Sequence, residues 1–168
     1  MARVVRKPGP GTARLEALLK NLANAHSRVG WLENATYENG TPAAYIAVIH
    51  ENGVEEKNIP PRPMLRPTVD EHQGEWRELA AKIAQRVISG DLSLKEGLGM
   101  LAAKAAGNLQ VTIGEITSPA LAEKTIEARR RKKERGLPIG SLSKPMQETD
   151  FLRSSVKFDV RDGKGEQE

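Results

Sequence analysis

The sequence predicts a single α+β domain in which a small antiparallel sheet packs against several helices. Alternating apolar residues predict one strand near each end of the chain, at residues 27–32 and 155–160. Apolar residues at helical spacing predict two long helices between residues 68 and 113. The chain of 168 residues is the size of one ordinary domain and contains no internal repeat.

The first elements are an arm, a helix and a strand. Residues 1–11 are basic and rich in Pro and Gly, which predicts a flexible arm. Thr12 is a good N-cap for a helix ending near Ala25, whose leucines recur at helical spacing. Val29 and Trp31 then share one face of the strand at residues 27–32, where Trp31 is expected to be a core anchor.

Residues 43–51 fit either a helix or a strand, with Asn52–Gly53 as a plausible helix C-cap. Four prolines follow within residues 59–67 and remove four backbone donors. This proline-rich stretch is therefore expected to be extended and to lie outside any sheet. It is either a docking segment or a rigid connector for the next helix.

Two helices are expected next, separated by Ser89–Gly90 and forming an antiparallel pair. Possible capping boxes, Thr68 with Glu71 and Ser93 with Glu96, mark their N-termini. Trp76 lies on the apolar stripe of the first helix and is read as a second core anchor.

Three glycines fall within the second of these helices, and each should cost about 0.8–1 kcal/mol relative to alanine. Close packing of a neighbouring backbone against that face of the helix would explain the glycines. Without such packing, they predict a frayed, bent helix. The three are Gly97, Gly99 and Gly107.

The C-terminal third begins with a polar helix at residues 121–133 and continues as a loop at residues 136–145. One or two helical turns are expected at residues 148–154. Val156, Phe158 and Val160 are then predicted to point inward from the final strand. Residues 161–168 form a polar tail. The domain boundaries are thus 1–11 for the arm, 12–160 for the domain and 161–168 for the tail.

Composition excludes several classes of function. Because the chain has no cysteine, disulfides, thiolate metal sites and thiol catalysis are excluded, which fits a reducing cytosol. No signal peptide is expected at the N-terminus, and the apolar runs are too short to span a bilayer. A net charge of +4 permits contact with nucleic acid or with acidic protein surfaces without demanding either.

No catalytic constellation is present in the sequence. His26, His50 and His72 have no metal-ligand partner at helical spacing, and no phosphate-cradling glycine loop follows a strand. We therefore expect no enzymatic activity, no cofactor and no metal. The basic run Arg129–Lys133 is the strongest charge feature. We read it as a solvated helix end, with contact to phosphates or an acidic partner as the second interpretation.

Several short elements, taken in order, resemble one known family. Ile49-His50-Glu51-Asn52-Gly53 is followed by Ile59-Pro60-Pro61-Arg62-Pro63-Met64, and later by Lys144-Pro145-Met146 with Thr149, Leu152 and Ser154. This order is similar to the virion-morphogenesis or tail-completion family of long-tailed bacteriophages. There, "His-Glu-Phe-Gly" precedes "Ile-Pro-Pro-Arg-Pro-Phe", and "Lys-Pro-Leu-x-x-Thr-Gly-x-Leu-x-x-Ser" closes the domain. The resemblance spans roughly residues 28 to 160.

Four positions depart from the family pattern. Asn52 stands where an aromatic residue is common, and Met64 and Met146 replace the usual Phe and Leu. Asp150 stands where Gly is usual, and aspartate tolerates a left-handed backbone less well than glycine. The turn at Thr149–Asp150 therefore departs from the pattern in its backbone requirement.

The resemblance implies a structural protein of the virion neck that forms a ring at the head-proximal end of the tail. Its implied partners are itself, as a six-fold or twelve-fold ring, and the connector or head-closure, tail-terminator and tail-tube proteins. It implies location in the virion, after assembly in the host cytoplasm, with contact to channel DNA left open and no membrane contact.

Because ring contacts join two different patches, the acidic region Glu51–Glu56 and the basic run are a candidate pair. The residues expected at partner or oligomer contacts are Glu51, Glu55, Glu56, Pro60, Pro61, Arg62, Pro63, Met64, Arg66, Arg129, Arg130, Arg131, Lys132 and Lys133. A tail terminator is an alternative in the same structural class, and a basic nucleic-acid-binding module is an alternative outside it. A small hydrolase or nuclease using His50 is a third reading without further support.

Overall fold

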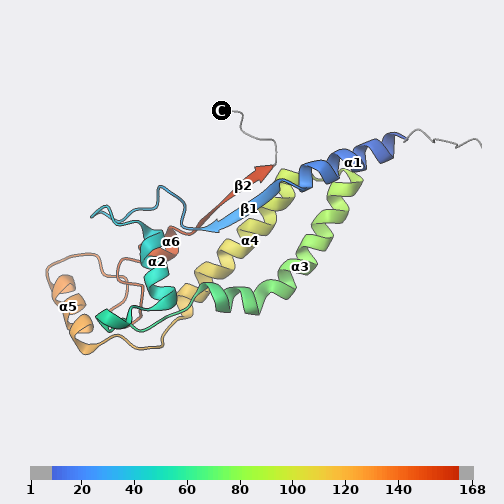
Figure 1. Cartoon of the computed structure of the whole chain (residues 1–168). Coiled ribbons are helices and arrows are strands. Elements are labelled where there is room, and N and C mark those ends of the chain that lie inside the picture. Colours follow the sequence, from blue (N-terminus) through green and yellow to red (C-terminus); the bar gives the residue numbers. More distant parts are fainter. Residues whose placement is uncertain (1–8, 163–168) are drawn as a thin grey trace, which may run out of the picture.

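The computed structural model describes residues 9–162, which form six α-helices, one short 3-10 helix and a two-stranded sheet (Figure 1). The predicted single α+β domain is confirmed. In chain order the elements are α1 (Pro10–Leu22), β1 (Ala25–Gly30), α2 (Ala43–Asn52), η1 (Glu55–Lys57), α3 (Leu65–Ser89), α4 (Leu94–Glu115), α5 (Glu123–Glu134), α6 (Phe151–Ser154) and β2 (Lys157–Asp162).

The sheet joins the two ends of the described chain. β1 pairs with β2 in antiparallel register, with Val29 opposite Phe158. The predicted pairing of an early strand with a late one is therefore correct. Alternate residues of β1 are half-buried and exposed, and α4 packs against both strands (Figure 1). On the outer face, the Arg28 guanidinium pairs with the Asp159 carboxylate across the strands.

The predicted pair of long helices is present as α3 and α4. Gly90 ends α3 in a left-handed conformation with φ 92°. The second predicted capping box is confirmed, because the Glu96 amide donates to Ser93 Oγ at 3.2 Å and the Ser93 amide donates to Glu96 Oε2 at 3.0 Å. The first is wrong. α3 begins at Leu65, so Thr68 lies inside its first turn and donates its hydroxyl to the Met64 carbonyl at 2.6 Å.

Other boundaries shift by a few residues. α1 starts at Pro10, whose fixed φ suits the first helical position, so Thr12 is not its cap. Residues 10 and 11 therefore belong to this helix, and the rest of the predicted arm, apart from Gly9, lies outside the described residues. Residues 43–51 are helical. Phe158 lies opposite Val29 in the sheet and is 40% exposed, so it is less buried than an inward-pointing residue was expected to be.

The main core lies at one end of the molecule, where α2, the second half of α4 and the segment carrying α6 meet. The Trp31 indole donates to the Leu152 carbonyl at 2.7 Å, which confirms its anchoring role. Trp76 is half-buried on α3 and lies outside this cluster. The buried members are Ala43, Ala47, Met64, Ala106, Leu109, Ile113, Met146, Leu152 and Val156.

The glycines of α4 differ in their surroundings. A Cβ on Gly97 would lie 2.5 Å from Ile83 Cγ2 of α3, so the two helices approach too closely here for alanine. The close contact is with a side chain of α3 and not with its backbone. Gly107 is exposed, and a Cβ there would meet nothing within 4 Å.

We expect Gly107→Ala to raise the free energy of unfolding by about 0.5–1 kcal/mol, because it removes only the helix penalty of glycine. Gly97→Ala should lower it, because overpacking costs about 1–3 kcal/mol and exceeds that gain. Urea denaturation of both variants tests the pair. Stabilisation by Gly97→Ala would contradict the close packing of α3 and α4.

Candidate functional site

Glu51 joins the end of α2 to the start of α3. Its carboxylate is buried and accepts three backbone hydrogen bonds, from Met64 at 2.6 Å, Leu65 at 2.9 Å and Arg66 at 3.2 Å. The first N–H groups of a helix lack partners within the helix and carry its positive dipole. Glu51 is therefore the cap of α3, supplied from another helix.

Gly53 makes this arrangement possible by reversing the chain after α2. Its φ is +71°, and a Cβ there would lie 2.7 Å from the Ile59 carbonyl oxygen and from Pro61 N. The backbone of the proline-rich segment therefore passes directly against Gly53, and any larger residue would displace it. The Val54 and Ile59 amides and carbonyls bond to each other and close the intervening loop.

Arg62 fastens the proline-rich segment to the chain that follows α4. Its guanidinium donates to the carbonyls of Pro119 at 2.9 Å and Ala120 at 3.2 Å, and its own amide donates to the His50 carbonyl at 2.6 Å. The side chain is buried, at 6% exposure. Arg62 therefore connects the proline-rich segment both to the end of α2 and to the distant chain after α4.

Arg129 plays the corresponding part for the loop after α5. Its Nη1 donates to the carbonyls of Ser141 at 2.9 Å and Lys144 at 2.7 Å, and its Nε lies 3.6 Å from Glu148 Oε2. The residue is 5% exposed. Lys132, one turn further along α5, also pairs with Glu148, at 2.5 Å.

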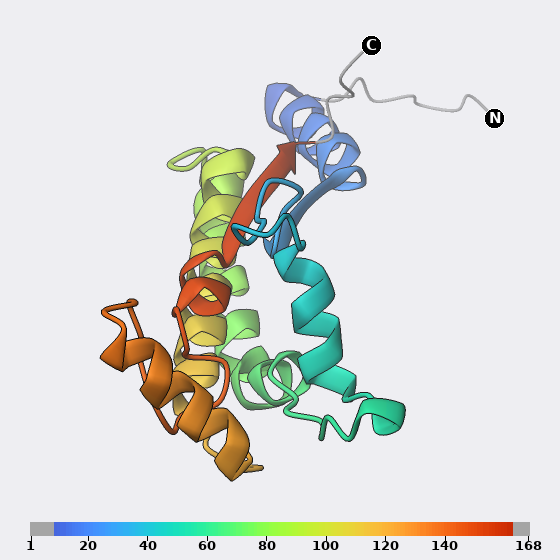
Figure 2. The same cartoon turned by 90° about the vertical axis from the view of Figure 1, so that its left-hand side faces the viewer.

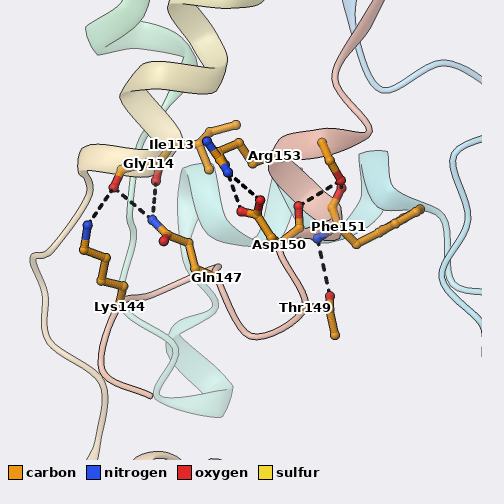
Figure 3. Close-up of polar contacts among 9 residues, drawn as sticks. Ile113, Gly114, Lys144, Gln147, Thr149, Asp150, Phe151 and Arg153 are labelled. Atoms are coloured by element: carbon orange, nitrogen blue, oxygen red, sulfur yellow. Dashed lines mark hydrogen bonds and ion pairs between the residues drawn. The ribbon is translucent and has the colours of Figure 1, made fainter. Parts of the chain in front are cut away.

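Figure 3 shows the segment between that loop and α6 resting on the end of α4. Gln147 Nε2 donates to the Gly114 carbonyl at 2.9 Å, and Lys144 Nζ reaches the same oxygen at 3.5 Å. These two side chains satisfy a carbonyl in the last turn of α4, which has no partner within the helix.

The departure from the family pattern at residue 150 also lies in this segment. Asp150 has φ +58°, the left-handed conformation that glycine adopts easily. Its carboxylate forms a two-point pair with Arg153, at 2.8 and 2.5 Å (Figure 3). This local pairing gives aspartate a stabilising contact that glycine would lack at the same position.

A cleft of about 830 Å³ lies between α2, α5 and the C-terminal segment. In Figure 2, α2 and α5 flank the segment that carries α6. Arg62, Arg129 and Lys132 line the cleft, and Glu148 is the one carboxylate among the described residues that line it. His50 and Tyr37 add an imidazole and a phenol. The cleft therefore carries three cationic side chains and one carboxylate.

Burial and nearby positive charges lower the pKa values of His50 and Arg62 in this cleft. Burial, and then the charge of Arg62, lower the pKa of His50 to about 4, so its imidazole is neutral at pH 7. Burial also lowers the pKa of Arg62, and the charge of Arg129 lowers it further. Both arginines remain protonated at pH 7, because a guanidinium keeps its proton in a folded protein even where burial lowers its pKa.

Four residues predicted at partner contacts are instead internal. Glu51, Arg62, Met64 and Arg129 are each at most 8% exposed, because their side chains cap a helix, bind carbonyls or fill the core. Glu51 is buried, so it is not available as part of the predicted acidic patch. Glu55 and Glu56 are exposed, and their pairing with the basic run of another copy stays a prediction. Of the other residues predicted at partner contacts, Pro60 is half-buried. The exposed ones are Glu55, Glu56, Pro61, Pro63, Arg66, Arg130, Arg131, Lys132 and Lys133.

Sequence reasoning missed the roles of Glu148 and Gln147. Neither belongs to a periodic pattern, and their partners Arg129 and Gly114 are far from them in sequence. The only available signal was their position between Met146 and Thr149 in the third family element. Such long-range polar contacts leave no local signature in a single sequence.

Removal of the Glu51 carboxylate should destabilise the protein. Glu51→Ala leaves three N–H groups without an acceptor, and we expect a loss of about 2–4 kcal/mol in the free energy of unfolding. Glu51→Gln retains one acceptor oxygen and should lose less. Glu55→Ala, at an exposed position of η1, is the matched control and should stay within about 0.5 kcal/mol of the wild type in urea denaturation.

His50 should make the protein less stable in mild acid. Because the folded pKa lies below the unfolded value, the unfolded chain binds the proton first as the pH falls from 6.5 to 4, so stability is lost across this window. Between pH 7 and 4.5, His50→Gln should lose about 1–2 kcal/mol less than the wild type, after allowance for partial exposure. Chemical denaturation at both pH values measures this. His26→Gln, at an exposed position of β1, is the control, and equal losses in wild type and His50→Gln would contradict the assignment.

Comparison of the chain with models of protein families, with curated proteins and with solved structures finds no match in any of the three. Within residues 9–162, no group of three or more His, Asp or Glu side chains is placed to hold a metal ion. In the same range, no helix is both long and apolar enough to cross a bilayer. What the site offers is a cationic cleft bounded by buried arginines.

Proposed function

We propose that this protein is a structural component of a bacteriophage neck, which forms a ring at the head-proximal end of the tail and completes the tail for head attachment. The observation that carries the proposal is the convergence of the sequence elements that resemble the tail-completion family. Glu51 of the first element caps the helix that follows the second, and Met64 of the second shares a core with Met146 and Leu152 of the third. Elements that matched by chance would have no reason to meet.

These elements maintain the fold, and none of them forms a catalytic arrangement in the described chain. The buried charged residues of the motifs bind backbone groups: Glu51 binds amides and Arg62 binds carbonyls. This is the pattern expected of a structural family, whose shared residues preserve a shape. It supports an assembly function over the hydrolase reading based on His50.

The end of the molecule opposite the core carries a candidate assembly surface. α1 lies there beside the turn between α3 and α4 (Figures 1 and 2). A groove of about 300 Å³ runs between these helices and is lined by apolar residues only. Leu19 and Ile88, which line it, are 57% and 60% exposed. Exposed apolar patches of this kind mark interaction sites on soluble proteins.

The occupant that we propose for this groove is a second copy of the chain. Besides Leu19, Leu15 and Leu22 of α1 also line the groove, and they are 42% and 51% exposed, so the leucines and the groove form one apolar patch. A second copy that covers this patch would remove these leucines from water. A ring forms when the patch of one copy meets a different surface of the next copy and the rotation between copies permits closure.

Two alternatives remain. A tail terminator would use the same surfaces within the same class of ring protein. A nucleic-acid-binding module is favoured by the exposed cations Arg130, Arg131 and Lys133 at the end of α5. Connector, head-closure and tail-tube proteins are the further partners that the neck proposal requires.

Self-assembly through the apolar groove can be tested by replacing Leu19. The purified wild type should form a discrete multimer in light scattering, or should form one when phage tails or connectors are added. High salt should not dissociate it, because the contact is apolar. Leu19→Asp should reduce the mass to that of the monomer without lowering the midpoint of urea unfolding.

Leu137→Asp, at a residue that is 50% exposed and outside the groove, is the matched control and should assemble as the wild type does. A wild type that stays monomeric with these partners and shifts duplex DNA at low salt would overturn the neck proposal in favour of nucleic-acid binding.

A further inference from the structure

The positive charges of the cleft between α2 and α5 exceed its negative charges. Arg62, Arg129 and Lys132 line it, whereas Glu148 is the one carboxylate among its described lining residues. Glu148 is shared between Arg129, at 3.6 Å, and Lys132, at 2.5 Å. Arg62 has no carboxylate within ion-pair distance in the part of the chain that the structure describes.

The hydrogen bonds of the two arginines do not cancel this charge. The acceptors of Arg62 and Arg129 are neutral backbone carbonyls. Arg129 Nε is buried and has no hydrogen-bond partner among residues 9–162. The two guanidiniums are about 95% buried, Arg129 shares its one carboxylate with Lys132, and Arg62 has none, so their desolvation is costly. An anion bound between them would offset that cost.

We propose that this cleft is a binding site for a phosphate-type oxyanion, held by Arg62, Arg129 and Lys132, with His50 as an additional donor. Arginine presents several N–H donors in a plane and binds phosphate oxygens with strong, charge-assisted hydrogen bonds. His50 is neutral at pH 7 and still carries one ring N–H that an oxygen can accept. The inference does not depend on the proposed neck function.

The charge and shape of the cleft favour phosphate over a single carboxylate. The cations exceed the carboxylate by two, and a phosphate monoester carries about 1.5 to 2 negative charges at pH 7. The donors come from different walls: His50 from α2, Arg62 from the proline-rich segment, and Arg129 and Lys132 from α5. A tetrahedral group with several acceptor oxygens can meet donors on several sides. This charge count favours free phosphate or a phosphate monoester. The backbone of a nucleic acid, which carries one negative charge at each phosphate, is the other source of the same oxygens.

Inorganic phosphate is the probe, titrated into the full chain at pH 7 and constant ionic strength by calorimetry and phosphorus NMR. Three variants each change one charge on or beside the cleft and leave both buried arginines in place. Lys132→Gln removes a cleft cation and should weaken binding about tenfold. Glu148→Gln removes the cleft carboxylate and should strengthen binding. Lys133→Gln makes the same charge change at an exposed position outside the cleft and should bind as the wild type does.

Circular dichroism establishes that each variant is folded, so that weak binding reports the site itself. Absence of binding to the wild type at millimolar phosphate would overturn the proposal. Equal binding by Lys132→Gln and Lys133→Gln would do the same, because it would indicate a general charge or salt effect. Given binding, displacement of phosphate by a short DNA duplex would identify a nucleic-acid backbone as the source, and failure to displace it would identify free phosphate.

Discussion

The contact on which the rest of the structure depends is the carboxylate of Glu51 at the N-terminus of α3. It fixes where the 25-residue helix α3 begins and therefore how the α3–α4 pair is set against α2. A buried carboxylate is stable only when hydrogen bonds or an opposite charge stabilise its negative charge. Here three backbone N–H groups and the positive end of the helix dipole do so. Because Gly53 allows the chain to return, the whole connection is made within the stretch between Glu51 and Arg66.

Buried charge is used in the same way elsewhere in the fold. Arg62 and Arg129 bind carbonyls of segments that lack regular secondary structure, namely residues 119–120 and 141–144. Irregular backbone leaves polar groups without partners, and long side chains with several donors can satisfy them at a distance. The cationic cleft is therefore a by-product of fastening loops with arginine. This origin explains why its charges are unbalanced, since loop carbonyls supply dipoles but no negative charge.

How much of this could be read from the sequence depends on the range of the interaction involved. The pairing of α3 and α4, the Ser93–Glu96 capping box and the strands at both ends follow local patterns, and all were predictable. The start of α3 was not predictable from local patterns. Its capping residue, Glu51, lies in another helix, and the apparent capping box at Thr68 is not used. Arg129 was read as part of a solvated run for the same reason. Its neighbours Arg130 to Lys133 are exposed, and only the distant carbonyls of Ser141 and Lys144 distinguish it.

The two ends of the molecule are stabilised differently, and this difference bears on how it would assemble. At the end with α2 and α6, buried side chains and charged contacts hold the segments together, so this end can keep its shape in an isolated copy. At the end with α1, the leucines are only half-covered and the groove beside them is open. Covering this surface with a second copy would bury apolar area at about 25 cal/mol per Å² without disturbing any of the polar contacts at the other end. Assembly at the α1 end and anion binding in the cleft are therefore physically separable, and a loss of one need not produce a loss of the other.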